Sequence, residues 1–147
     1  MKVVVQRVKE SSCTVENTVI SKIDNGFLLL VGFTQNDSIK EVEYLAKKIA
    51  NLRIFEDEEG KLNRSISDMN YEILSISQFT LYGDASKGNR PSFTKALEPI
   101  KALELYLELT RIMNQKYNIK TLNGAFGKQM DINLLNDGPV TIILESK

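Results

Sequence analysis

Residues 26–33 place the strongest constraint on the fold of this 147-residue chain, because their sequence, GFLLLVGF, contains no polar side chain. A run of this length matches a β-strand, and a strand without a polar face has to be covered on both faces. It is also the longest apolar run of the chain and is far shorter than the roughly 18 residues that cross a bilayer. We therefore predict a buried central strand and no membrane partner.

Other short segments rich in β-branched residues predict further strands. One of them covers residues 2–8, and residues 13–16 and 19–23 are predicted to form a hairpin around Asn17 and Thr18. The remaining strands are predicted at residues 53–55, 72–77, 128–135 and 139–145.

Two segments show helical periodicity. In the first, Ser38 and Glu41 have the spacing of a capping box, and a helix is predicted over residues 38–52. Its apolar residues recur at i, i+3, i+4 and i+7, and they are Val42, Leu45, Ala46 and Ile49. The second helix is predicted to begin at Pro99, since the fixed φ of proline suits the first helical turn. Its apolar side is predicted to consist of Leu103, Tyr106, Leu107, Thr110 and Met113.

The order of these segments indicates an α+β fold. Strands outnumber helices and do not alternate strictly with them, which favours a mainly antiparallel sheet system backed by two long helices. No linker, repeat or low-complexity stretch divides the chain, and its length is that of one domain, commonly about 100–150 residues. We expect residues 1–147 to form a single domain.

The chain contains no histidine, which excludes several kinds of catalytic site. Ser-His-Asp and Cys-His catalysis, imidazole acid–base chemistry and His-ligated metals all require the missing side chain. The single cysteine, Cys13, lies in a predicted strand and is interpreted as a small, semi-buried residue rather than a nucleophile. No metal site and no cofactor are expected. Carboxylates, hydroxyls, lysines, backbone amides or a group on the substrate remain available.

The charge balance limits the partners of the chain. A formal net charge of +0 and a pI of about 6.3 argue against broad, sequence-independent binding of nucleic acid, so no DNA partner is expected. The same balance is compatible with contacts to one end of an RNA. The N-terminal segment has no signal-peptide layout, because Gln6 and Arg7 interrupt its apolar residues, and a cytoplasmic location is expected.

Ser77, Gln78, Phe79 and Thr80 follow a predicted strand and precede a polar loop, so two interpretations remain open. Backbone amides free of the sheet can stabilise an oxyanion, and the two hydroxyls can position a polar substrate. Alternatively, the hydroxyls simply continue the solvent face of the strand, which the local pattern alone favours. A serine hydrolase is disfavoured, because no base is evident that would activate the hydroxyl.

Three other segments carry a functional and a structural interpretation each. Gly138 and Pro139 suit a turn, or a cis X-Pro bond whose neighbouring carbonyls face a ligand. Phe126 and Met130 can sandwich a nucleobase, although packing in the core is the commoner role of such residues. Arg90 belongs to a small basic cluster that can meet a phosphate or can be a solvated loop.

The segments SQFTL, at residues 77–81, and NDGPVT, at residues 136–141, closely resemble the two signature motifs of the D-aminoacyl-tRNA deacylases. The resemblance extends over the whole chain, and neither signature departs from the family pattern. Its further segments are residues 5–8, 53–55, 60–63, 88–93 and 121–127, with Met130.

The resemblance implies a homodimer with a barrel-like β architecture and the helices outside. Each active site would lie at the dimer interface, with Gly138 and Pro139 of one subunit, joined by a cis bond, entering the site of the other. Their carbonyls would hold the α-amino group of the substrate and exclude an L side chain, a form of steric discrimination. Glycine has no side chain to exclude, so some hydrolysis of glycyl-tRNA is implied.

The implied reaction is hydrolysis of the ester that joins a D-amino acid to the 3′-terminal adenosine of tRNA, in chiral proofreading of translation. Ser77, Gln78, Phe79 and Thr80 would form the catalytic segment, with amides near Phe79 and Thr80 stabilising the oxyanion. The favoured mechanism has the ribose 2′-OH assist a water, and the alternative has the Thr80 hydroxyl attack directly.

The resemblance also assigns the substrate contacts. Phe126 and Met130 would hold the terminal adenine, and Arg90 would support the pocket or contact a phosphate. An alternative function is that of a non-catalytic binder of the tRNA 3′ end.

Overall fold

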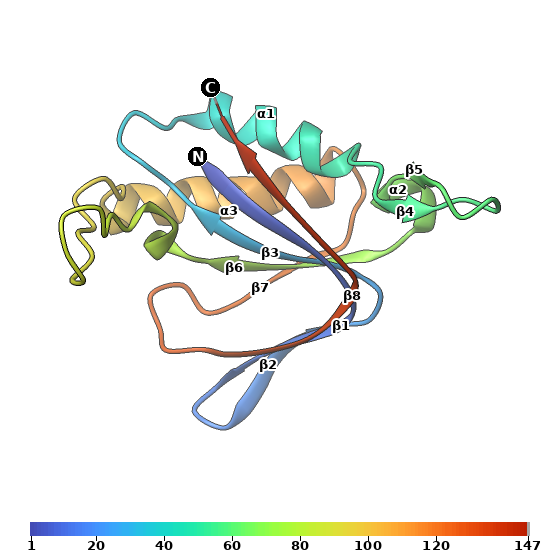
Figure 1. Ribbon diagram of the computed structural model, residues 1–147, viewed down its shortest axis with the longest axis horizontal. Helices are drawn as coiled ribbons and strands as arrows, with labels where there is room; N and C mark the ends of the chain where they lie inside the picture. The colour runs from blue at the N-terminus through green and yellow to red at the C-terminus, as the bar shows by residue number, and fades with distance from the viewer. Residues whose placement is uncertain (147) are drawn as a thin grey trace.

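The computed structural model describes residues 1–146 of the chain and has a mixed α+β fold (Figure 1). The strands are β1 (Lys2–Val15), β2 (Thr18–Ile23), β3 (Gly26–Gly32), β4 (Phe55–Glu56), β5 (Leu62–Arg64), β6 (Glu72–Ser77), β7 (Thr121–Asn123) and β8 (Asp131–Glu145). The α-helices are α1 (Ile39–Ala50), α2 (Ile66–Met69) and α3 (Pro99–Gln115), and a 3-10 helix, η1, covers Phe79–Tyr82.

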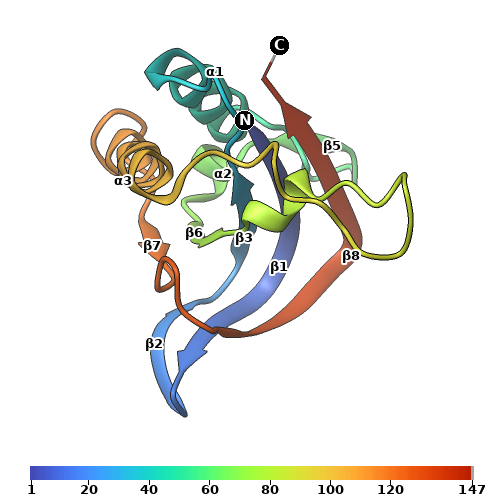
Figure 2. The same ribbon diagram turned by 90° about the vertical axis from the view of Figure 1, so that its left-hand side faces the viewer.

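The main sheet has the strand order β2-β1-β3-β6-β7, and β8 pairs with the other edge of β1. Figure 2 shows the strands curving into a nearly closed, barrel-like arrangement with α1 and α3 outside it. The prediction of a mainly antiparallel system is confirmed, although the system also contains two parallel pairings. β1 pairs antiparallel with its neighbours, but β3–β6 and β6–β7 are parallel, because long connections that contain α1 and α3 carry the chain back across the sheet.

The apolar run at residues 26–33 forms β3, and the prediction that both of its faces are buried is confirmed. Phe27, Leu29 and Val31 belong to the core between the sheet and the helices. Leu28 belongs to a second, smaller core on the other side of the sheet, together with Cys13. Cys13 is fully buried rather than semi-buried. β3 therefore separates two apolar cores and contributes to both.

Both long helices lie close to their predicted positions. Ser38 caps α1, and the predicted capping box with Glu41 is present. Pro99 begins α3 as predicted, but the predicted apolar side is partly wrong, since Leu107 is 52% exposed. The buried side of α3, which faces the sheet and α1, consists of Ala102, Leu105, Tyr106, Leu109, Ile112 and Met113. Within residues 1–146, no helix combines the length and the apolarity that crossing a membrane requires.

β1 is one strand of 14 residues, whereas the pattern predicts two separate strands. The exposed Lys9 and Glu10 interrupt the apolar alternation, but the backbone stays extended there because β8 pairs along the other edge. The register shifts in this region, and β1 passes from pairing with β3 to pairing with β2. The polar interruption therefore marks an irregularity in a continuous strand rather than its end.

β8 also replaces two predicted strands, and the turn interpretation of Gly138 and Pro139 is wrong, because the chain does not reverse there. In the pairing with β1, Gln6 faces Thr141 and Val8 faces Asn136, so residues 137–140 together lie opposite Arg7 alone. These residues bulge from the ladder. A proline is tolerated at such a position, since bulges and edge strands do not need every backbone donor.

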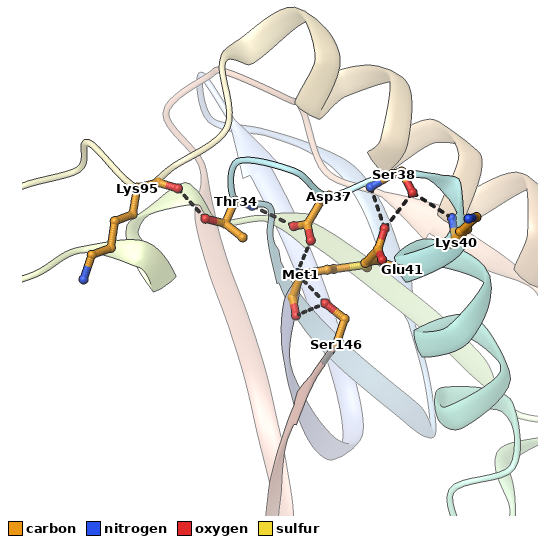
Figure 3. Close-up of polar contacts among 8 residues, drawn as sticks. All are labelled: Met1, Thr34, Asp37, Ser38, Lys40, Glu41, Lys95 and Ser146. Atoms are coloured by element: carbon orange, nitrogen blue, oxygen red, sulfur yellow. Dashed lines mark hydrogen bonds and ion pairs between the residues drawn. The ribbon is translucent and has the colours of Figure 1, made fainter.

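The α-amino group of Met1 is buried and connects the start of β1 to the end of β8 (Figure 3). It donates to Asp37 Oδ1 at 2.6 Å and to Ser146 Oγ at 2.7 Å. Asp37 Oδ2 also accepts from the Thr34 amide at 2.7 Å, and the Thr34 hydroxyl donates to the Lys95 carbonyl at 2.6 Å. This network links β1 and β8 to the turn that follows β3.

We predict that Asp37→Asn lowers the free energy of unfolding by about 3 kcal/mol, because it leaves a buried positive charge without its anion. Urea denaturation followed by circular dichroism measures the change. The matched control is Asp24→Asn, since Asp24 is exposed and forms no ion pair with the described residues. The control should change stability by less than about 0.5 kcal/mol. Equal effects of the two variants would contradict a stabilising role of the network.

Candidate active site

A cavity of about 610 Å³ lies where β3, β6 and the start of α3 meet the loop between β7 and β8. Figure 2 views the molecule from the side on which these segments come together. One wall contains Ser77, Gln78 and Phe79, and the loop contributes Phe126 and Met130. The fold thus brings two of the predicted segments, which are separated by about 50 residues of sequence, to one cavity.

The wall at Ser77–Phe79 is made by the end of β6. The Gln78 amide still donates to the Val31 carbonyl, at 2.7 Å, and extends the pairing with β3. The chain then turns into η1, whose first backbone donor is the Leu81 amide, bonded to the Gln78 carbonyl at 3.2 Å. The amides of Phe79 and Thr80 precede that donor, and within residues 1–146 no acceptor is bonded to either of them.

The side chains of this segment depart from the strand interpretation. Ser77 is half-buried and lines the cavity, and Thr80 lies in the 3-10 helix, so the two hydroxyls do not continue a solvent face. The Gln78 side-chain amide donates to the Thr80 hydroxyl. Phe79 is 57% exposed and packs edge to face on Phe93, with ring centroids 5.2 Å apart.

Phe126 and Met130 are both half-buried, so each packs on a core and also faces the cavity. The ring of Phe126 lies 5.7 Å from that of Tyr106. Met130 lies over Gly124, where an added Cβ would come within 2.8 Å of its sulfur. Because Gly124 has no side chain, the Met130 sulfur has room to lie in the cavity wall.

Tyr106 contacts two parts of this wall, β6 and the ring of Phe126. Its hydroxyl donates to the Ser75 carbonyl of β6 at 2.5 Å. Burial raises the pKa of Tyr106 to about 12, so the phenol keeps its proton at neutral pH and remains a donor. A single side chain therefore joins β6 to the ring of Phe126.

Gly138 and Pro139 are joined by a cis peptide bond and are exposed on β8, and they do not line the cavity of their own chain. Gly138 has a φ of +115°, and a Cβ there would lie 3.1 Å from the Arg7 guanidinium. The segment is therefore built for glycine, and its placement depends on Arg7.

Arg7 is a buried residue that the sequence interpretation missed. Its Nε donates to the Asp137 carbonyl at 3.3 Å and lies 3.2 Å from Asp137 Oδ2, while Nη1 donates to the Ile54 carbonyl at 2.7 Å. A signal was present, because Arg7 follows the buried Val3 and Val5 at the same two-residue period. A charged residue at a core position of a strand indicates a specific partner.

Arg90 is not brought to the cavity. It is exposed in the loop between η1 and α3, which is closed by paired backbone hydrogen bonds between Asp84 and Ser92, each of 2.8 Å. Lys95, the neighbouring cation, forms an ion pair with Asp84 at 3.1 Å.

The chemistry available in the cavity is that of amides, hydroxyls, apolar surfaces and one ammonium group, that of Lys128. Among the described residues that line it, none carries a carboxylate or an imidazole. Cys13 lies in the smaller core, and burial raises the pKa of its thiol, so it is protonated at neutral pH. The cavity can bind a flat ring and stabilise a negative oxygen, but these residues provide no general base.

Residues 4–145 match the model of the family described as D-Tyr-tRNA(Tyr) deacylase. A protein of Exiguobacterium sibiricum named D-aminoacyl-tRNA deacylase is 57% identical over 145 residues, which cover 99% of each chain. A solved structure titled "c-Myc DNA Unwinding Element Binding Protein" has a TM-score of 0.95 at 44% identity and covers 100% of this chain and 99% of that one.

A second solved structure, of a probable eukaryotic D-amino acid tRNA deacylase, has a TM-score of 0.83 at 15% identity and covers 97% of both chains. At that identity it shows a shared fold alone. The family model and the bacterial relative, in contrast, match nearly the full length of the sequence. The chain is therefore a member of the D-Tyr-tRNA(Tyr) deacylase family.

Proposed function

We propose that this chain hydrolyses the ester bond of D-aminoacyl-tRNA, releasing the free D-amino acid and tRNA in chiral proofreading of translation. The observation that carries the proposal is the cavity in which Ser77, Gln78 and Phe79 face Phe126 and Met130. At this wall the amides of Phe79 and Thr80 are bonded to no acceptor within residues 1–146. Membership of the deacylase family supports the same reaction. Residues 1–147 would act as one domain in the cytoplasm, where aminoacyl-tRNA is used.

In the proposed mechanism, Ser77, Gln78, Phe79 and Thr80 form the catalytic segment. The amides of Phe79 and Thr80 bind the oxygen that becomes negative as water attacks the ester carbonyl. One such donor is worth about 10²–10³ in kcat. Because no carboxylate or imidazole is present among the described cavity side chains, the ribose 2′-OH of the RNA assists the water. The Thr80 hydroxyl accepts a hydrogen bond from Gln78, which favours a positioning role over nucleophilic attack.

Phe126 and Met130 hold the terminal adenine in this proposal. An aromatic ring and a thioether both adapt to the flat face of a base, and stacking on an aromatic is worth about 1–3 kcal/mol. Arg90 lies outside the cavity, so we assign it to a phosphate further along the RNA rather than to the pocket. The partner is the RNA 3′ end and not DNA.

We infer a homodimer in which Gly138 and Pro139 complete the site of the partner. Support comes from their exposure on β8 and from the apolar side chains of Leu134, Leu135 and Ile143, which are exposed on the same strand. Arg7 holds this segment at a defined position. Its carbonyls would bind the substrate amine and leave no room for an L side chain, while a D side chain or the hydrogen of glycine is accepted.

The first prediction concerns chirality. Purified protein should release D-Tyr from D-Tyr-tRNA at least about 100-fold faster than L-Tyr from L-Tyr-tRNA, since a steric clash costs more than about 2.7 kcal/mol. Release of labelled amino acid measures both rates, and glycyl-tRNA should be hydrolysed as well. Equal rates for both isomers would refute the proposal. Retained binding of charged tRNA without hydrolysis would instead identify a non-catalytic binder of the RNA end.

The second prediction separates the two mechanisms. D-Tyr-tRNA that ends in 2′-deoxyadenosine should react about 100-fold more slowly or worse, because an assisting proton-transfer group contributes about 10²–10⁴. Thr80→Ser should retain activity in either mechanism and serves as the control for Thr80→Ala. Loss of all activity in Thr80→Ala, with trapping of an acyl group on the wild-type residue, would establish the nucleophilic alternative.

The third prediction concerns the shared site. Leu135→Glu should convert the dimer to a monomer in sedimentation velocity and abolish deacylation, because it places a charge in an apolar interface. Leu107→Glu is the matched control, since Leu107 and Leu135 are each 52% exposed. The control should remain dimeric and active. A monomeric but fully active Leu135→Glu variant would contradict the shared site.

A further inference from the structure

Lys128 is the only charged side chain among the described residues that line the cavity. It lies two residues after Phe126 and two before Met130, so it belongs to the same wall as the proposed adenine site. The backbone here is a tight turn, in which the Lys128 amide donates to the Ala125 carbonyl at 3.2 Å and Gly127 has a φ of +74°. The turn therefore fixes the starting point of the lysine side chain at the edge of the cavity.

The ammonium group of Lys128 is uncompensated. It forms no ion pair with any carboxylate of residues 1–146, whereas Lys2, Lys95 and Lys120 each lie against one. The other described residues of the cavity are uncharged. A single exposed cation beside an uncharged cavity raises the local concentration of anions there. Such a point charge on a flexible stem suits a phosphate.

We propose that Lys128 binds the phosphate on the 5′ side of the 3′-terminal adenosine. This inference rests on the proposed function, because it takes the adenine to lie between Phe126 and Met130. The ribose must then point toward Ser77–Phe79, where its ester reacts. Its 5′ oxygen then points toward the open edge of the cavity, where Lys128 lies. The contact adds affinity for the nucleotide and takes no part in the bond that breaks.

Two minimal substrates that differ only in this phosphate test the assignment. One is D-Tyr esterified to the 3′ oxygen of adenosine, and the other is the same ester of adenosine 5′-monophosphate. Lys128→Ala should lower kcat/KM for the phosphorylated substrate about fivefold, through KM, which is the loss expected for one exposed charge contact. It should leave the unphosphorylated substrate unchanged. Lys128→Arg should retain most of the wild-type value, because it keeps the charge.

Lys116→Ala is the control for a general loss of positive charge, since Lys116 is exposed at the other end of α3. It should affect neither substrate. Equal losses on both substrates in Lys128→Ala, or no loss on either, would overturn the proposal. On full-length tRNA, Lys128→Ala should also reduce the slope of log binding constant against log salt by about 0.7–0.9, the contribution of one phosphate contact.

A separate binding measurement distinguishes this inference from the proposed function. Titration calorimetry of the wild type should show tighter binding of adenosine 5′-monophosphate than of adenosine, and Lys128→Ala should remove the difference. If neither ester is hydrolysed but this preference is present, the deacylase proposal fails and the phosphate contact stands. If both esters are hydrolysed and the wild type shows no preference, the phosphate contact is refuted and the deacylase proposal stands.

Discussion

The burial of β3 on both faces is the constraint from which the rest of the structure follows. Phe27, Leu29 and Val31 face the helices, and Leu28 faces the smaller core on the other side of the sheet, so the chain has to cover both faces of β3. The long connections through α1 and α3 cover one side, and the curvature of β1 and β8 encloses the other (Figure 2). The end of β3 then becomes a wall of the cavity.

The proposed catalyst consists mainly of backbone held by well-packed supports. A chain without histidine has to rely on amides, carbonyls and its substrate, and such groups act only when their positions are fixed. Parallel pairing with β3 holds the end of β6, and Arg7 holds the bulge at Gly138 and Pro139. Both supports are buried, whereas the groups that would meet the substrate are accessible.

The sequence predicted most of the elements from local signals. Three local signals were each sufficient to predict an element: the capping box at Ser38, Pro99 at a helix start and the apolar run at residues 26–33. Local signals failed where a neighbouring strand decided the outcome. β1 and β8 pair along their length, so neither the exposed Lys9 and Glu10 nor the Gly138–Pro139 bulge ends a strand.

For the site, the sequence by itself determined which chemistry was available and, through two signature segments, which family to expect. It excluded imidazole chemistry outright, and its candidate residues included Ser77–Thr80, Phe126 and Met130. Only the tertiary structure decided that Ser77–Phe79, Phe126 and Met130 share one cavity and that Arg90 lies outside it. It alone also showed that Arg7 contacts Asp137 and that Lys128 lines the cavity. The physical reason is that residue type sets what a group can do, while its neighbours across the sheet set where it lies and whether it is paired.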